Sequence, residues 1–207
     1  MIDLSELKSL LTNDLQKKYI PSSVILDKLS IINEEDRKSS VYVDSNYIPF
    51  YYYLGKYLKP KKVLELGVNL GYISCAFLTS STDVTDYLAY QELTNEFYPN
   101  KIVVKNIKKI FKNNLGLFVG KFSDSNFQNL LDCGWDLIIF NEEKFYDKYL
   151  YQLDFLWEKM NKNGFLIMEK VLSNTPAKDA FNSFCLSKNI ENLIFSTRYG
   201  TGIIKKE

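Results

Sequence analysis

Residues 63–74 read VLELGVNLGYIS, an apolar run that leads into a glycine-containing turn and then into a helical pattern. Gly67 and Gly71 allow a sharp turn and a close approach of a ligand to the backbone, and Asn69 is the non-glycine residue that best tolerates a positive φ. Free N–H groups at the start of the following helix favour a negatively charged or polar ligand group. The alternative is an ordinary strand-to-helix turn whose glycines serve packing.

The chain around this stretch alternates short apolar strands with amphipathic helices. Strands are predicted at 62–67, 86–91, 116–120, 135–140, 164–169, 192–198 and 201–206, and helices at 71–80, 98–113, 124–132, 145–161 and 176–188. Such alternation indicates a parallel sheet covered on both faces. Tyr199-Gly200 forms a turn too short for a crossover, so the last strand must run antiparallel. We therefore predict an α/β fold with a doubly wound, mostly parallel seven-stranded sheet and an antiparallel last strand.

The first 59 residues are predicted to be a helical extension or lid on a domain formed by residues 60–207. Leucines at helical spacing over residues 3–19 indicate an amphipathic helix that Pro21 ends. Residues 31–44 are polar and predict a loop, and an aromatic helix follows as far as Leu58. Tyr47 and Tyr51 of that helix, with Tyr42 and Asp44 before it, are candidate pocket residues or simply parts of a buried aromatic helix.

The composition excludes several classes of function. Apolar residues make up 46% of the 207 residues, which is enough to bury a core. The balance of 26 basic against 25 acidic residues argues against a nucleic-acid partner, because polyanion binding needs surplus basic charge. Apolar runs fall far short of the about 20 residues that span a membrane, and there is no signal-peptide pattern. Three scattered cysteines without a C-x-x-C fit a reduced, cytoplasmic setting.

The chain contains no histidine. This absence rules out a Ser-His-Asp triad, a Cys-His pair and a histidine-liganded zinc. It also removes the commonest general base at neutral pH, so any proton transfer must use another side chain.

The stretch at residues 63–74 resembles the first motif of class I S-adenosylmethionine (SAM)-dependent methyltransferases, acidic-x-Gly-x-Gly-x-Gly, with Asn69 in place of the middle glycine. Residues 135–141, WDLIIFN, resemble the fourth-strand motif of this family, and residues 164–169, GFLIME, resemble its fifth strand. An antiparallel seventh strand is the hallmark of the family. The resemblance covers about residues 60–206, and the spacing is similar to the small O-methyltransferase-like branch.

The resemblance implies SAM as the cofactor. It implies that the loop after the first strand contacts the methionine and ribose, and that the end of the second strand holds the ribose hydroxyls. Phe122 could stack on adenine or equally belong to the core, and Lys121 stands where the family has an acid. The cofactor-binding residues so predicted are Glu65, Gly67, Val68, Asn69, Gly71, Gln91, Glu92, Phe122 and Asn141.

The sequence departs from the family where catalysis would occur. The pattern Asp-Gly-x-His-x-Tyr becomes NEEKFY at residues 141–146, so Asn141 replaces the catalytic or metal-binding acid and Lys144 the histidine. Lys170, preceded by Glu169, replaces the acid after the fifth strand. Glu142, Glu143 and Glu169 could supply oxygen ligands, but the aligned positions are not acidic, and we expect no metal.

We therefore expect metal-independent transfer of a methyl group to a small-molecule acceptor, at oxygen or nitrogen, by proximity and orientation. The candidate catalytic residues are Asn141, Glu142, Lys144 and Glu169, with Tyr146 as a further base, although each acid or lysine could instead serve a surface or ion-pair role. An alternative is a cofactor-binding protein of this fold without significant catalysis, acting as a regulatory or partner subunit. A nucleotide-dependent oxidoreductase is disfavoured by the closing hairpin and the poor match to Gly-x-Gly-x-x-Gly. The aromatic N-terminal helices could form a homodimer face.

Overall fold

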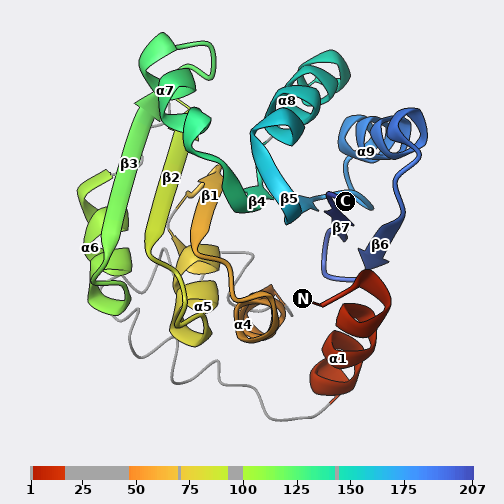
Figure 1. Cartoon of the computed structure of the whole chain (residues 1–207), viewed down its shortest axis with the longest axis horizontal. Coiled ribbons are helices and arrows are strands. Elements are labelled where there is room, and N and C mark those ends of the chain that lie inside the picture. The colour runs from red at the N-terminus through yellow and green to blue at the C-terminus, as the bar shows by residue number, and fades with distance from the viewer. Residues whose placement is uncertain (1, 17–46, 70, 93–99, 143–144) are drawn as a thin grey trace.

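A computed structural model describes residues 2–16, 47–69, 71–92, 100–142 and 145–207. In this part of the chain a seven-stranded sheet has the order β3-β2-β1-β4-β5-β7-β6, with helices on both faces (Figure 1). The strands are β1 (Lys62–Leu66), β2 (Asp86–Glu92), β3 (Asn114–Gly120), β4 (Trp135–Phe140), β5 (Met160–Glu169), β6 (Asn192–Phe195) and β7 (Thr201–Lys205). Strand β7 is antiparallel to both of its neighbours, β5 and β6, which confirms the predicted sheet.

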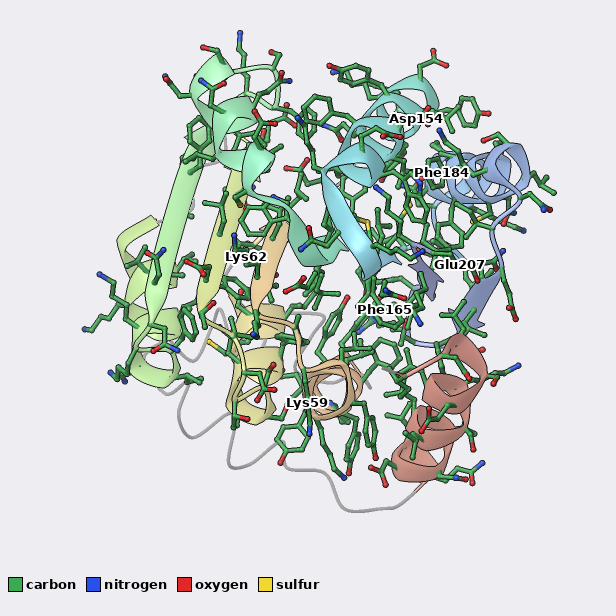
Figure 2. The ribbon with its side chains drawn as sticks, viewed as in Figure 1. Lys59, Lys62, Asp154, Phe165, Phe184 and Glu207 are labelled. Atoms are coloured by element: carbon green, nitrogen blue, oxygen red, sulfur yellow. The ribbon has the colours of Figure 1, made fainter. Side chains whose placement is uncertain are left out.

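Helices cover the two faces of the sheet in two groups. One face packs against α4 (Tyr47–Leu58), α5 (Tyr72–Ser80) and α6 (Asn100–Ile110). The other packs against α7 (Ser125–Leu130), the short 3-10 turn η1 (Leu131–Cys133), α8 (Tyr146–Lys159) and α9 (Thr175–Lys188). Helix α1 (Leu4–Gln16) lies beside α4 and β6 (Figure 1). Figure 2 shows Phe165 on the α4 side of the sheet and Phe184 on the α9 side.

Alternation along each strand decides which side chains enter which core. On β1, Val63 packs into the core under α4 and α5, whereas Leu64 and Leu66 pack into the core under α8 and α9. Glu65, two residues after Val63, faces the same side of the sheet, and its side chain is fully buried on the α5 side. The sheet therefore carries an ionisable group into an apolar layer directly before the glycine loop.

Element boundaries differ from the prediction at several points. Strand β5 begins at Met160 rather than 164, because Met160 pairs with Trp135 before a register shift. Helix α6 ends at Ile110, whereas the prediction extended it to residue 113. The predicted helix end at Pro21 and the predicted loop at 31–44 lie outside the described residues. The division of the chain at residue 59 stays a prediction.

The strand order points to the carboxyl ends of β1 and β4 as the place for a ligand. The chain leaves β1 toward β2 and β3 on one side and later enters β4 and β5 on the other, so the order reverses between β1 and β4. Ligands of open α/β sheets bind at such a reversal, outside the carboxyl ends of the strands. Within the described residues, no helix combines the length and the apolar character needed to cross a membrane.

Candidate functional site

The loop after β1 is built on left-handed backbone conformations. Gly67 has φ 80°, Asn69 has φ 47° and Gly71 has φ 78°. A Cβ atom on Gly67 would lie 2.2 Å from the backbone oxygen of Asn141, at the end of β4. Gly67 therefore allows the loop to press directly against the neighbouring strand, which a larger residue would prevent.

Hydrogen bonds fasten this loop to the end of β2. The backbone N–H groups of Gly67 and Val68 both donate to the backbone carbonyl oxygen of Tyr90, over 2.9 and 3.2 Å. The Asn69 N–H donates to Gln91 Oε1 over 2.9 Å. Its own side-chain amide donates to the Gly67 oxygen over 2.8 Å. Gln91, which the sequence assigned to ribose binding, thus also holds the loop in place, a role that spacing alone did not indicate.

The start of α5 offers backbone donors to a ligand. Gly71 occupies the N-cap position and makes no side-chain cap hydrogen bond. The first N–H groups of a helix lack partners within the helix and carry partial positive charge. Because α5 follows the loop directly, these donors lie at the carboxyl edge of β1, where they can bind a carboxylate or another polar group. Glu92, half-buried, and Gln91 lie at the end of β2 beside the same edge.

Asn141 and Glu142 bring the end of β4 against the loop. The Asn141 N–H donates to the Leu66 oxygen over 2.9 Å, and its side-chain amide to the Gly67 oxygen over 3.4 Å. The Glu142 side chain is 6% exposed, and its Cγ lies 2.9 Å from the position of a Cβ on Gly67. Tyr149 of α8 donates its hydroxyl to the Glu142 backbone oxygen over 2.8 Å. Burial raises the pKa of Glu142 to about 8.

Glu65 lies beneath the loop. Its Oε2 atom accepts hydrogen bonds from the hydroxyls of Ser74 on α5 and Tyr87 on β2. Burial raises the pKa of this carboxyl to about 7, although both hydroxyl donors favour the charged form. The structure therefore places Glu65 where it supports β1, β2 and α5 from the core side. A direct contact of Glu65 with a cofactor stays a prediction.

Glu169 ends β5 on the face that α4 covers. Its Oε1 atom accepts hydrogen bonds from the Tyr51 hydroxyl of α4 and, over 3.0 Å, from Thr201 of β7. Burial raises the pKa of Glu169 to about 7, and the hydroxyl donors oppose this shift. The pairing of Tyr51 with Glu169 was missed in the sequence, since 118 residues separate the two.

The structure thus separates the predicted catalytic residues. Asn141 and Glu142 meet the glycine loop, whereas Glu169 lies under α4. Lys144, like Tyr42 and Asp44, lies outside the described residues. Tyr146 has its hydroxyl 3.1 Å from Ser183 Oγ on α9.

Phe122 lies in an aromatic cluster between β2, α7 and α8. It is 5% exposed and packs edge-on against Tyr90, Phe127 and Phe155, with ring centroids 5.6 to 6.3 Å apart. Of the two roles that the sequence left open, this packing favours the core over stacking on adenine.

The described acids do not form a metal centre. Among residues with described positions, no group of three or more His, Cys, Asp or Glu side chains is arranged to hold a metal ion. The Glu142 side chain lies against Gly67, whereas the Glu169 carboxyl accepts a hydrogen bond from Tyr51 under α4. Glu143 lies outside the described residues.

Comparisons with known proteins agree with this architecture. No family model matches the sequence, and no curated protein matches it. Solved structures match along the whole chain. An O-methyltransferase from Bacillus cereus in complex with S-adenosylhomocysteine (SAH) has a TM-score of 0.67 at 14% identity, covering 97% of this chain and 100% of that one.

Two further structures show the same likeness. The SAH-bound methyltransferase PaMTH1 from Podospora anserina has a TM-score of 0.62 at 14% identity, covering 100% of this chain and 98% of that one. The O-methyltransferase TomG from Streptomyces achromogenes, involved in tomaymycin synthesis and solved with SAM, has a TM-score of 0.62 at 12% identity and full coverage of both chains. The chain therefore has the Rossmann-like fold of class I SAM-dependent O-methyltransferases.

Proposed function

We propose that the chain is a SAM-dependent methyltransferase that acts on a small-molecule acceptor at oxygen or nitrogen. The observation that carries this proposal is the loop from Gly67 to Gly71. It combines left-handed backbone conformations with the donor end of α5 and presses against β4 at the reversal of strand order. Structures of the same fold that were solved with SAM or SAH support it.

The residues at this edge fit the groups of SAM. The first N–H groups of α5 would hold the methionine carboxylate, since they are donors at the positive end of a helix. Gln91 and Glu92, half-buried at the end of β2, would bind the ribose hydroxyls. When bound, SAM supplies a methyl group that its sulfonium already activates, so the protein contributes mainly orientation.

Glu142 is the proposed proton acceptor. A hydroxyl or ammonium acceptor loses a proton when it is methylated, and the chain has no histidine to take it. Glu142 lies against Gly67, and its pKa of about 8 makes it a stronger base than an exposed carboxylate once it is ionised. Asn141, bonded to the Leu66 and Gly67 oxygens, would hold the end of β4 at the loop.

We propose that transfer needs no metal ion. A divalent cation of this kind needs several clustered oxygen ligands. Glu169 accepts hydrogen bonds from the hydroxyls of Tyr51 and Thr201. Among the described residues, no group of three or more His, Cys, Asp or Glu side chains is arranged to hold such an ion.

A second function, cofactor binding without significant turnover, is favoured by Asn141. The position that bears an acid in the resembling family holds a neutral amide here, and this amide is used in fastening the loop. In that case the protein would act as a regulatory or partner subunit.

Calorimetry with SAM, SAH and NAD, followed by a methyl-acceptor panel, tests these functions. We expect binding of SAM and SAH at micromolar concentrations, no binding of NAD, and transfer to at least one acceptor. Binding without transfer to any acceptor would favour the second function. Failure of both adenosyl compounds to bind below millimolar concentration would refute both.

A further inference from the structure

Helix α4 connects α5, whose first turn we assign to the cofactor, with the end of β5. It packs along α5 (Figure 1). The Tyr51 hydroxyl of α4 also donates to Glu169 at the end of β5, and Thr201 of β7 donates to the same carboxyl. Between these two attachments lie β1 and β4, where the strand order reverses. The helix therefore connects the two walls of the proposed site from below.

The attachment to α5 is close along the whole length of both helices. A Cβ on Gly55 would lie 2.4 Å from the Phe77 backbone oxygen, so the two helix backbones nearly touch at this point. At the last residue of α5, the Ser80 hydroxyl donates to the backbone oxygen of Tyr52 in α4. At the near end, the first turns face each other, and Tyr47, Ile48, Tyr72 and Ile73 line one small hollow.

The attachment to β5 is formed by hydrogen bonds to the buried Glu169 carboxyl, which Tyr47 of α4 joins as well as Tyr51. Tyr51 and Glu169 are 0% and 2% exposed, and the Tyr51 hydroxyl donates to Glu169 Oε1. Thr201 of β7 donates to the same oxygen over 3.0 Å, and its own Oγ1 lies 2.8 Å from Thr197 Oγ1. A buried hydrogen bond to an acid has a well-defined geometry and is costly to leave unmade, so it fixes the lateral position of α4.

We propose that Tyr51 is a positioning residue for the cofactor site: through Glu169 it anchors α4, and α4 in turn sets the position of the first turn of α5. This inference rests on the proposed function, because it assigns the α5 donors to the cofactor. Tyr51 itself contacts no reacting group. Its removal should loosen the donors rather than delete any of them.

The test compares two tyrosines of the same helix. Tyr51→Phe removes the hydroxyl that reaches Glu169 and keeps the ring in the core. Tyr57→Phe is the matched control, because the Tyr57 hydroxyl also donates to a buried acid, Asp14, but on the α1 side of α4. For each protein, calorimetry measures SAH affinity. Backbone hydrogen exchange without ligand is followed over residues 47–58 and 71–80, and the melting temperature is measured as well.

We expect Tyr51→Phe to weaken SAH binding by about tenfold, the effect of one buried hydrogen bond lost from the anchor. Exchange should become faster in the first turns of both α4 and α5. Tyr57→Phe should lower the melting temperature but leave SAH affinity within about twofold of the parent. Glu169→Gln, which keeps an oxygen for the Tyr51 hydroxyl, should retain more affinity than Tyr51→Phe.

The outcomes separate this inference from the proposed function. If the parent protein binds SAH and Tyr51→Phe binds equally well, the positioning role is wrong and the proposed function stands. Equal weakening by both tyrosine variants would also overturn it, since a general loss of stability would then explain the effect. If the parent binds neither SAM nor SAH, the proposed function fails, and this inference fails with it.

Discussion

The two sides of the candidate cleft satisfy their polar groups in different ways. On the loop side, backbone N–H groups donate to the backbone oxygen of Tyr90 and to the side-chain oxygen of Gln91. The side-chain amide of Asn69 donates to the backbone oxygen of Gly67. On the β4–β5 side, Glu142 and Glu169 are buried acids whose pKa values are raised to about 8 and about 7. The hydrogen bonds within the loop therefore join uncharged groups, whereas the β4–β5 side carries acids whose charge depends on pH, as does that of Glu65 beneath the loop.

Replacing Gly67 by valine should break the loop side completely. The new side chain would overlap the Asn141 oxygen, which lies 2.2 Å from the Cβ position, and φ 80° is unfavourable for valine. We expect the unfolding free energy to fall by about 3 kcal/mol and SAH affinity by about a hundredfold or more. Denaturant unfolding and calorimetry measure the two effects.

Gly71→Ala is the matched control for that change. Gly71 has a similar φ of 78°, but a Cβ there would meet Ile107 at 3.5 Å, an ordinary contact. Only the backbone strain of about 1 kcal/mol should remain. If Gly67→Val bound SAH as well as the parent does, the cofactor would have to lie elsewhere.

Glu142→Gln tests the other side through catalysis. Removing a general base should lower kcat by about a hundredfold. SAH affinity should stay within about twofold, because the amide has nearly the same shape as the carboxyl. In the parent, the rate should rise with pH as Glu142 ionises toward its pKa of about 8, and this rise should vanish in the variant. Asp147→Asn, an exposed acid at the start of α8, should leave both the rate and the profile unchanged.

The stability of the protein should fall as the pH rises. Glu65, Glu142 and Glu169 have pKa values of about 7, 8 and 7 in the fold, above the ordinary glutamate value of 4.5. Between pH 4.5 and these raised pKa values, the folded state therefore binds more protons than the unfolded chain. The stability that the three acids contribute is complete below about pH 4.5 and is lost as the pH rises to about 8. We expect the melting temperature to drop by about 5 °C between pH 5.5 and 8.5. Glu65→Gln should flatten this slope, and an unchanged slope would show that folding does not raise the pKa of Glu65.

Gln91→Ala should produce the smallest effect, confined to the loop side. It removes the acceptor of the Asn69 N–H, a part-buried hydrogen bond of 2.9 Å. The loss of about 1 kcal/mol should weaken SAH binding by about fivefold. Gln91→Glu keeps an oxygen acceptor and should restore the affinity, whereas equally weak binding by both variants would contradict the fastening role.

The loop side could be predicted from the sequence because its determinants are local. Gly67, Asn69 and Gly71 lie within five residues, and their chemistry restricts the backbone directly. The mostly parallel seven-stranded sheet and its antiparallel last strand followed from the alternation of strands and helices and from one short hairpin. The start of β5 was missed because its pairing of Met160 with Trp135 depends on a register shift that periodicity does not reveal.

The β4–β5 side depends on contacts between distant residues, and these could not be predicted. Tyr51 and Glu169 meet only because α4 crosses the sheet, and Thr201 joins them only because β7 lies beside β5. In the sequence, Tyr51 is one aromatic residue among many in its helix. Phe122 likewise could not be assigned until its neighbours Tyr90, Phe127 and Phe155 were known.

The position of β7 has a consequence for how the sheet assembles. Strand β6 reaches the sheet only through β7, although it precedes β7 in the chain. Because a hairpin joins two neighbouring segments, its loop closes quickly, whereas pairing with β5 spans a longer separation. We infer that β6 and β7 form as a unit and dock onto β5 in one step. Docking also delivers Thr201 to Glu169, so the burial of that acid is completed only when the last strand is in place.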